Sequence, residues 1–461
     1  MTTTANLAAR LEGLLGVHRV IVAAESELLD YAIDGLVPAA IVRPHSAPEV
    51  AEVVRFALAE KLAVIPTGSR GKLGLGMPPA RYDIALDMTG LHGIAHYDAG
   101  DLTLSVDAGM PLRELAKVLA EKNQFLPLSV PCYETTTIGG TLASAIDSTL
   151  RHQYGTSRDF LIGAEFVDGK GALCKSGGRV VKNVTGYDLH KLLVGSLGTL
   201  AVITRLNFRT FTLPHAYGGH LASFSGLDAV SAYRLAIENS GLPLANLETL
   251  SPEMLNLAAS VLRETHPEFT LPLDHANWYV YASYEGLEAV VPRIARDLQK
   301  LSSEATAITN ELLDPASDTH LRGVFREAFD WLRWASPAVA LFRIVLPQSK
   351  ASDLAALLRA AQEPSLRNAV LLRAAGVIYL ASFGENEDEA TVRSLETAST
   401  RIFSLAAASH GHATLLHAPL KLKSRLNVWG PKPADFSMMQ RVKDSFDPHR
   451  IFAPGRFVGG I

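Results

Sequence analysis

The chain has little of what several large protein classes require. Only two of its 461 residues are cysteines, Cys132 and Cys174, and they form no CxxC pair. Two thiols cannot supply the four thiolate ligands that an iron–sulfur cluster usually takes. If the protein works with such a cluster, a partner chain must carry it.

Long apolar runs and an excess of basic charge are also missing. No apolar stretch approaches the roughly 18 residues of a membrane-spanning helix. Residues 1–10 lack the basic and then apolar pattern of a secretory signal, so the sequence predicts a cytoplasmic protein. The formal net charge of -4 gives no basic excess of the kind that marks a nucleic-acid-binding protein.

The composition describes a globular protein of more than one domain. Hydrophobic residues make up 48% and charged residues 20% of the sequence, as in ordinary folded proteins. The length exceeds what one hydrophobic core usually serves. Residues 1–35 read as a helical lead-in. Glycine-rich loops interrupt the following strands and helices but disappear after Pro214, and no internal repeat is visible in the sequence.

A strand–helix–strand unit in residues 39–65 leads into a glycine-rich loop. Ser46 and Glu49 have the spacing of a capping box, which indicates the start of the helix. The loop itself, residues 66–76, contains four glycines. Glycine permits positive φ angles and close backbone approach, so the N–H groups of such a loop can converge on a phosphate. Two cations, Arg70 and Lys72, could add charge.

Neither of the two common phosphate-binding motifs is present in this loop. Gly71 and Lys72 are followed by Leu73, so the Ser or Thr that binds magnesium in a Walker A motif is missing. The glycines also lack the GxGxxG spacing of a Rossmann fingerprint. Considered alone, the loop is equally compatible with an ordinary glycine-rich turn.

A second segment strengthens the phosphate interpretation. Residues 131–159 form a long stretch rich in glycine, threonine and serine, which is unusual in a compact domain unless it is functional. Thr137 opens a run of small residues that would let the backbone press against a flat ligand. Asp159 lies where a loop meets a strand, and its alternative role is to cap that turn. Two such segments in one domain indicate a ligand site much more strongly than one.

Read in order, these residues resemble the FAD-binding domain of the vanillyl-alcohol oxidase (p-cresol methylhydroxylase) superfamily over residues 36–214. The stretches 178–189 and 195–200 look like its glycolate oxidase and D-lactate dehydrogenase branch. Residues 68–72 are closest to the FAD-binding subunit of glycolate oxidase called the E subunit. The resemblance implies an α+β fold in which a two-subdomain FAD-binding domain of the p-cresol methylhydroxylase type carries an inserted α+β, ferredoxin-like cap domain.

The resemblance also implies domain boundaries. Residues 446–448 and 451–456 resemble the terminal signature of this branch, which suggests that the end of the chain returns to the FAD-binding domain. The expected parts are a lead-in at 1–35, the FAD-binding domain at 36–214, the cap or substrate-like domain at 215–424, and a C-terminal segment at 425–461.

The same resemblance assigns FAD contacts to specific residues. The first loop would hold the pyrophosphate, the second segment would line the cofactor, and a later strand would approach it with its backbone. The implied contacts are Thr67, Gly68, Ser69, Arg70, Gly71, Pro131, Thr137, Gly139, Gly140, Ser144, Gly155, Asp159, Val202 and Ile203. Some members attach flavin covalently through a histidine in the first loop. No histidine occurs there in this chain, so noncovalent FAD is expected.

The chain departs from its catalytic relatives at the substrate site. Those relatives often carry a Gly-Asp-Gly-Asn-x-His segment and a Glu-His-Gly segment, which together bind a divalent metal that grips the substrate. Neither occurs here, so no metal is expected and the catalytic residues stay unknown. The nearest pattern leaves His412 and His417 as candidates, and a strand would place His410 and His412 on one face. The alternative is a partly exposed strand whose histidines bind nothing.

Three functions remain open on the sequence. The leading hypothesis is an FAD-binding subunit of a glycolate (D-2-hydroxy-acid) oxidase complex, which relays electrons from a sister FAD subunit to an iron–sulfur subunit. Such a chain would be cytoplasmic and would reach the inner membrane only through its partners. The second hypothesis is a self-sufficient FAD-linked oxidoreductase acting on a hydroxy acid or sugar alcohol. The third is a noncatalytic assembly subunit that binds FAD for stability.

Overall fold

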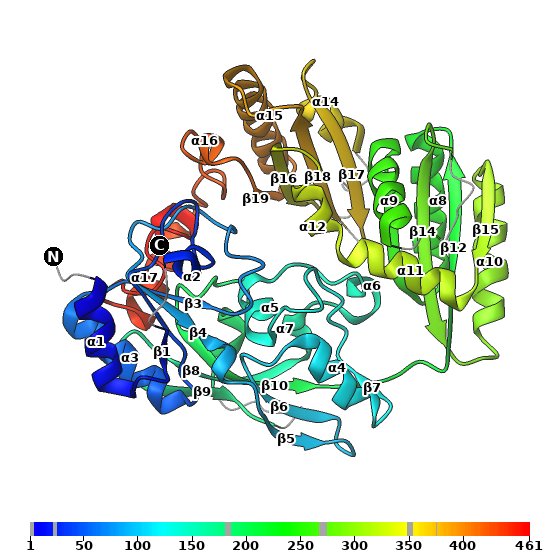
Figure 1. Ribbon diagram of the computed structural model, residues 1–461. Helices are drawn as coiled ribbons and strands as arrows, with labels where there is room; N and C mark the ends of the chain where they lie inside the picture. The colour runs from blue at the N-terminus through cyan, green and yellow to red at the C-terminus, as the bar shows by residue number, and fades with distance from the viewer. Residues whose placement is uncertain are drawn as a thin grey trace.

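The computed structural model describes residues 4–21, 25–179, 186–265, 267, 274–347, 354–374 and 376–461. Figure 1 shows two lobes. The first lobe contains the N-terminal part of the chain, in blue, cyan and, at β8 to β10, green, together with the red C-terminal end. The second lobe contains a large sheet flanked by helices, in green, yellow and brown. The middle of the chain therefore forms the second lobe, and both ends of the chain lie on the first.

A small sheet opens the first lobe. Strands β2, β4 and β3 are parallel and neighbour each other in that order, and β1 pairs with β2 in the antiparallel direction. The elements are α1 (Thr4–Leu15), β1 (Val20–Ile21), α2 (Glu25–Leu29), β2 (Ala40–Val42), α3 (Ala47–Glu60), β3 (Val64–Thr67) and β4 (Ile84–Asp87). Strand β1 lies within the lead-in, where the sequence indicated helices alone.

Helix α3 begins where the sequence predicts. Ser46 accepts a hydrogen bond from Glu49 N at 3.3 Å, which satisfies one of the N–H groups left unpaired at a helix start. The apolar stripe of the helix, with Val50 and Val54 fully buried, packs into the core of this sheet. The helix ends at Lys61, which has a left-handed φ of 57°. These contacts fix β3, and the glycine-rich loop leaves from its end.

A five-stranded antiparallel sheet, in the order β5-β6-β10-β8-β9, completes the first lobe. The apolar face of α4 packs on it, with Leu115 and Leu119 almost fully buried. The elements are η1 (Met88–Gly90), β5 (Ile94–Asp98), β6 (Thr103–Asp107), α4 (Leu112–Ala120), β7 (Gln124–Phe125), α5 (Ile138–Ser144), α6 (Arg151–Tyr154), α7 (Ser157–Phe160), β8 (Leu161–Val167), β9 (Leu173–Gly177), η2 (Leu189–Leu192), β10 (Val202–Arg209) and β11 (Phe211–Thr212).

The second lobe is one eight-stranded antiparallel sheet in the order β15-β12-β14-β13-β17-β18-β16-β19. Its strands are β12 (Ala216–Phe224), β13 (Leu244–Leu250), β14 (Trp278–Gly286), β15 (Thr309–Leu313), β16 (Ala338–Val345), β17 (Arg367–Arg373), β18 (Val377–Gly384) and β19 (His412–His417). Its helices are α8 (Leu227–Ser240), α9 (Pro252–Thr265), α10 (Val291–Glu304), α11 (Pro315–Arg326), α12 (Ala328–Arg333), α14 (Leu354–Ala361) and α15 (Glu389–Ala408).

This sheet contains a structural repeat that the sequence does not reveal. β12-α8-β13 and β14-α10-β15 form one strand–helix–strand–strand–helix–strand unit, and β16-α14-β17 and β18-α15-β19 form another. The two units meet where β13 pairs with β17, with Thr249 opposite Leu372. The repeat is therefore one of topology, and the sequence itself shows no internal repeat. A shared topology needs a shared pattern of apolar positions and not a shared sequence.

The C-terminal segment packs on the first lobe. Its elements are α16 (Leu420–Lys423), α17 (Phe436–Phe446) and η3 (Val458–Gly460). Phe452 forms a parallel bridge with Val64 of β3. The Lys443 ammonium donates to Asp447 Oδ2 at 2.7 Å and to Thr199 O at 2.6 Å, both buried contacts. In Figure 1 the red α17 accordingly lies beside the blue elements.

The predicted α+β architecture, with its ferredoxin-like topology in the second lobe, is confirmed. Among the described residues, no helix is long and apolar enough to cross a membrane.

Candidate functional site

A cavity lies at the end of β3, between the first glycine loop and α5. It encloses about 800 Å³ of space that no atom fills, part of which is open to solvent. Its walls come from the loop after β3, the start of α5, strand β10 and the C-terminal segment. The lining residues are Pro66, Thr67, Gly68, Ser69, Arg70, Gly71, Lys72, Leu73, Met88, Ala108, Thr136, Thr137, Gly139, Gly140, Ala143, Ser144, Leu197, Gly198, Ala201, Ile203 and Arg456.

Glycines keep the two segments in close contact around this cavity. A Cβ on Gly139 would lie 2.8 Å from both the Cβ and the carbonyl oxygen of Ala108. A Cβ on Gly68 would collide with the side chain of Thr137 in the other segment. Real Cβ atoms do not approach other atoms so closely, so neither position tolerates a side chain without movement of the wall.

The loop after β3 presents free hydrogen-bond donors. Arg70 has a left-handed φ of 69°, a geometry that turns successive N–H groups toward one side and forms an anion-binding nest. Within the described part of the chain, the N–H groups of Ser69, Arg70 and Gly71 have no acceptor. The start of α5 differs, because Gly139 N already donates to Ala108 O at 2.8 Å. The donors for a phosphate therefore belong to the first loop.

Three cations line the cavity, Arg70, Lys72 and Arg456, and no carboxylate lines it. Among the described residues, none of the three has an Asp or Glu oxygen within 4.0 Å. The Lys72 ammonium donates to the Thr136 hydroxyl at 2.7 Å, and burial lowers the pKa of this ammonium. Arg456 is only 3% exposed, and its Nε has no partner in the described structure. Burial lowers the pKa of its guanidinium to about 10.

This combination fits FAD. A buried or partly buried cation without a counter-ion is costly, and a diphosphate supplies the missing negative charge. The free N–H groups of the first loop supply hydrogen bonds to the same phosphates. Small and apolar residues such as Ala143, Ala201 and Ile203 line the remaining wall, where a flat ring system can pack.

Most of the predicted FAD contacts line this cavity. They are Thr67, Gly68, Ser69, Arg70, Gly71, Thr137, Gly139, Gly140, Ser144 and Ile203. The structure brings these residues together from three separate stretches of the chain, as the resemblance implied.

The other predicted contacts do not reach the cavity wall. Asp159 accepts hydrogen bonds from Thr156 N and Oγ1 at 2.7 and 2.8 Å, so it caps α7, and Gly155 turns beside it with a φ of 75°. Val202 is fully buried in the core, because consecutive residues of a strand face opposite sides and Ile203 faces the cavity. Pro131 is absent from the lining. Contact with FAD stays a prediction for these four residues, as it does for the ten that line the cavity.

Two charged residues of the site are absent from the predicted contacts. Lys72 lies in the first loop, where its charge was noted, but the family pattern assigns no contact to it. Arg456 is the last residue of the terminal signature, which indicates a return to the FAD-binding domain, yet nothing local indicates that its side chain reaches a loop nearly four hundred residues earlier in the chain. Its guanidinium donates to the carbonyl oxygens of Leu73 and Leu75. Of the family stretch 178–189, residues 180–185 lie outside the described residues.

The candidate histidines are absent from the lining of the cavity. Strand β19 begins at His412, and His410 precedes it with a left-handed φ of 55°, so the expectation of one shared strand face is wrong. Neither His412 nor His417 lines the cavity. Burial, with Lys423 and Arg333 nearby, lowers the pKa of His417 to about 4. In the described structure, no group of three or more His, Cys, Asp or Glu side chains could hold a metal ion.

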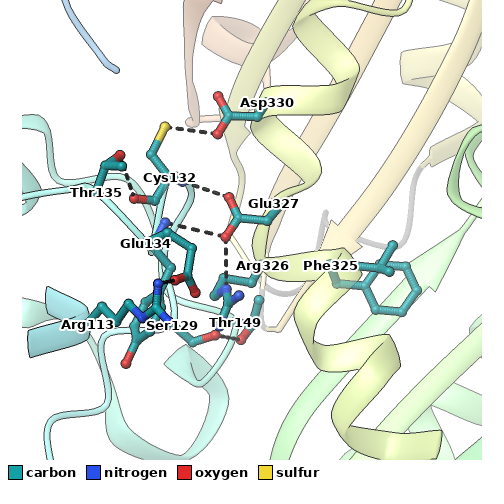
Figure 2. A network of polar contacts seen from close by, with 12 residues as sticks. Arg113, Ser129, Cys132, Glu134, Thr135, Thr149, Phe325, Arg326, Glu327 and Asp330 are labelled. Atoms are coloured by element: carbon teal, nitrogen blue, oxygen red, sulfur yellow. Dashed lines mark hydrogen bonds and ion pairs between the residues drawn. The ribbon is translucent and has the colours of Figure 1, made fainter. Parts of the chain in front are cut away.

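The second lobe supports the back of the cavity. Figure 2 shows Glu327 and Asp330 facing Cys132 of the second glycine segment. Cys132 N donates to Glu327 Oε2 at 2.7 Å, and its thiol donates to Asp330 Oδ2 at 2.9 Å. Arg333 Nη1 donates to Gly71 O at 3.0 Å. Burial raises the pKa of the Cys132 thiol to about 12, so this cysteine is a protonated structural donor.

Comparisons with known families agree with this arrangement. The model of the FAD binding domain matches residues 38–177. The model of the C-terminal domain of FAD linked oxidases matches residues 216–457, more than half of the chain. The structure of p-cresol methylhydroxylase with substrate bound superposes with a TM-score of 0.77 at 16% identity, covering 99% of this chain and 97% of that one. This similarity shows a shared fold.

Curated relatives include subunits of one enzyme. The chain is 23% identical over 435 residues to glycolate oxidase subunit GlcD of Bacillus subtilis, covering 91% of this chain and 88% of that protein. It is 36% identical over 166 residues to glycolate oxidase subunit GlcE of Escherichia coli, covering 36% of this chain and 47% of that protein. It is 23% identical over 424 residues to the mitochondrial D-2-hydroxyglutarate dehydrogenase of Rattus norvegicus, covering 90% and 77%.

Proposed function

We propose, from the premise that this chain belongs to the FAD-linked oxidase family of the vanillyl-alcohol oxidase superfamily, that it is the FAD-bearing subunit of a complex oxidising 2-hydroxy acids such as glycolate. Family membership makes it an FAD-dependent oxidoreductase. The proposed part is its place in the complex. It receives electrons from a sister FAD subunit and relays them to an iron–sulfur subunit.

The cavity with three cations and no carboxylate carries the cofactor assignment. Arg70, Lys72 and Arg456 would bind the diphosphate together with the N–H groups of the first loop. The wall formed by α5 and β10 would orient the ring. Bound FAD supplies the capacity to accept and pass on electrons, and the protein supplies position, electrostatics and exclusion of water.

Two observations favour a relay subunit. The highest identity among the relatives described above, 36%, is to a stretch that covers 47% of a glycolate oxidase subunit, GlcE. The described residues also contain no cluster of metal-binding side chains that could grip a hydroxy acid. With only two cysteines in the chain, the cluster that takes the electrons belongs to a partner. We place the chain in the cytoplasm, at the inner membrane only through those partners.

Anaerobic reduction tests this role. Purified FAD-loaded chain is mixed with glycolate or D-lactate while the flavin absorbance is followed, first alone and then with the partner subunits. We expect slow or no reduction of the isolated chain and fast reduction in the complex. The chain should also co-purify with flavin and iron–sulfur partners. Fast reduction of the isolated chain at the rate of the complex would contradict the relay role.

We also propose that FAD is held noncovalently. No histidine, cysteine or tyrosine is among the residues that line the cavity, and these are side chains that form covalent bonds to flavin. Acid precipitation should therefore leave the flavin in the supernatant. Flavin that remains with the precipitated polypeptide would contradict this part of the proposal.

A self-sufficient hydroxy-acid or sugar-alcohol oxidoreductase is the second candidate. It is favoured by the similarity to the mitochondrial D-2-hydroxyglutarate dehydrogenase of Rattus norvegicus, a relative not named as a subunit, which extends over 90% of this chain and 77% of that protein. Steady turnover by the isolated chain with an artificial acceptor separates this candidate from the relay role.

A further inference from the structure

A buried carboxylate lies just beyond the cofactor cavity, in the interface between the lobes. Asp147 lies three residues after Ser144, which is the last residue of α5 and lines the cavity. Its neighbour Ile146 belongs to the same apolar cluster as Leu197, another lining residue. The side chain of Asp147 is only 2% exposed. A charged group at this position needs partners, because burial alone would favour its neutral form.

The partners of Asp147 come from both lobes. Arg343 of β16 donates through Nε to one carboxylate oxygen and through Nη2 to the other, the second at 3.2 Å. Arg151 of α6 donates to the same carboxylate. Tyr379 of β18 completes the set, with its hydroxyl 3.4 Å from Oδ2. Burial raises the pKa of Asp147, but Arg343 and Arg151 outweigh it and hold the pKa below its usual value.

The second lobe presents these donors as one unit. Arg343 and Tyr379 lie directly opposite each other on neighbouring strands, so their side chains share one face of the sheet. Arg373 adds a third guanidinium, which donates to the main-chain oxygen of Asp147 at 3.1 Å and to Glu248 at 2.8 Å. An arginine that binds in a bidentate manner, together with a neighbouring phenol hydroxyl, is a set of hydrogen-bond donors suited to a carboxylate.

We propose that Arg343, Arg151 and Tyr379 form a carboxylate-binding site that the chain fills with its own Asp147, so that a small carboxylic acid cannot enter it in the wild-type protein. A tethered and oriented carboxylate outcompetes a free one, since folding has already fixed its position. The side chains of both arginines are about a quarter exposed, 26% for Arg343 and 25% for Arg151. Removal of Asp147 would therefore open a site that solvent can reach.

Binding measurements on the FAD-loaded protein test this inference directly. Asp147→Gly removes the atoms of an acetate ion, so sodium acetate and sodium glycolate are titrated calorimetrically into wild type and variant at ionic strength matched with sodium chloride. We expect both carboxylates to bind the variant at least tenfold more tightly than the wild type. The double variant Asp147→Gly/Arg343→Met should lose this gain. No gain in the single variant, or a gain that survives loss of Arg343, would overturn the proposal.

A control variant tests whether the gain in binding needs the arginine site, and a second comparison serves if Asp147→Gly does not fold. Asp188→Gly removes a carboxylate that is 55% exposed and paired with Lys191, and it should leave carboxylate binding at the wild-type level. A gain in this variant equal to that in Asp147→Gly would overturn the proposal, because it would show that the effect does not need the arginine site. If Asp147→Gly does not fold, wild type and Arg343→Met decide the question. Equal, weak glycolate binding by both supports a filled site, whereas clearly tighter binding by the wild type shows an open one and overturns the inference.

The inference is independent of the relay role. It concerns equilibrium binding to one chain, and the relay role concerns electron transfer among several. A failed reduction experiment therefore leaves this test intact, and an open carboxylate site would not by itself exclude a relay.

Discussion

Two regions of this molecule place cationic side chains away from solvent, and they differ in whether a carboxylate pairs with those side chains. In the cofactor cavity, Lys72 and Arg456 have no carboxylate partner in the described structure. In the interface between the lobes, Arg343 and Arg151 converge on Asp147. An unpaired charge in a protein interior costs folding free energy, whereas a charge with a bonded counter-ion needs no further partner. The cations of the first region therefore suit a ligand from outside, and those of the second suit a carboxylate of the chain itself.

Charge reversal in the cavity should have the largest effect. Lys72→Glu places a negative charge beside the phosphates, and we expect FAD affinity to fall about a hundredfold or more, roughly 3 kcal/mol. Fluorescence titration of the apoprotein with FAD measures this loss. Lys72→Arg keeps the charge and should remain within tenfold of wild type. A loss below threefold in the glutamate variant would show that Lys72 does not face the cofactor phosphates.

A substitution in the interface between the lobes should lower the free energy of unfolding and hardly change FAD affinity. Removal of one partner from a buried ion pair costs about 3–5 kcal/mol, and Arg151 still holds Asp147, so Arg343→Met should cost about 3 kcal/mol. Urea unfolding measures this cost, and FAD titration should change less than threefold. Arg293→Met, which affects a side chain that is 77% exposed, should cost under about 0.5 kcal/mol. A large loss of FAD affinity in Arg343→Met would break the distinction between the two regions.

His417 should make the fold sensitive to acid. Its pKa falls from 6.5 to about 4 in the fold because of burial and the nearby cations Lys423 and Arg333. Below pH 6.5 the unfolded chain therefore binds a proton that the folded chain does not, and stability decreases as the pH falls toward 4. The contribution is about 2 kcal/mol after allowance for partial exposure. His417→Gln should reduce the loss of stability between pH 6.5 and 4 by that amount, and equal slopes for variant and wild type would contradict the shift.

His412 should matter least. It stands at the exposed start of β19 and does not line the cavity. His412→Ala should leave glycolate oxidation by the assembled complex within about threefold of wild type and stability within about 0.5 kcal/mol. A loss of activity greater than tenfold, with FAD content unchanged, would indicate that the catalytic centre lies near this strand.

Local signals account for what the sequence predicts well. The Ser46 cap, the strand leading into the first loop and the glycines of both segments depend on residues close together in the chain. The family resemblance added FAD and the overall fold, and both agree with the matched family models. For Asp159, the local spacing and the family resemblance indicate two different roles. Its capping role follows from local spacing, and the cap is what the structure contains.

The position of the cofactor loop and its need for glycine can be read from the residues alone, because φ angles and close backbone approach are local properties. Which charges meet depends on how the chain folds in three dimensions. Arg456 enters the cavity because the end of the chain pairs with β3, and Arg343 reaches Asp147 because the second lobe folds as two joined ferredoxin-like units against the first. Interactions between residues hundreds of positions apart depend on how whole lobes pack, and no short sequence pattern records that packing.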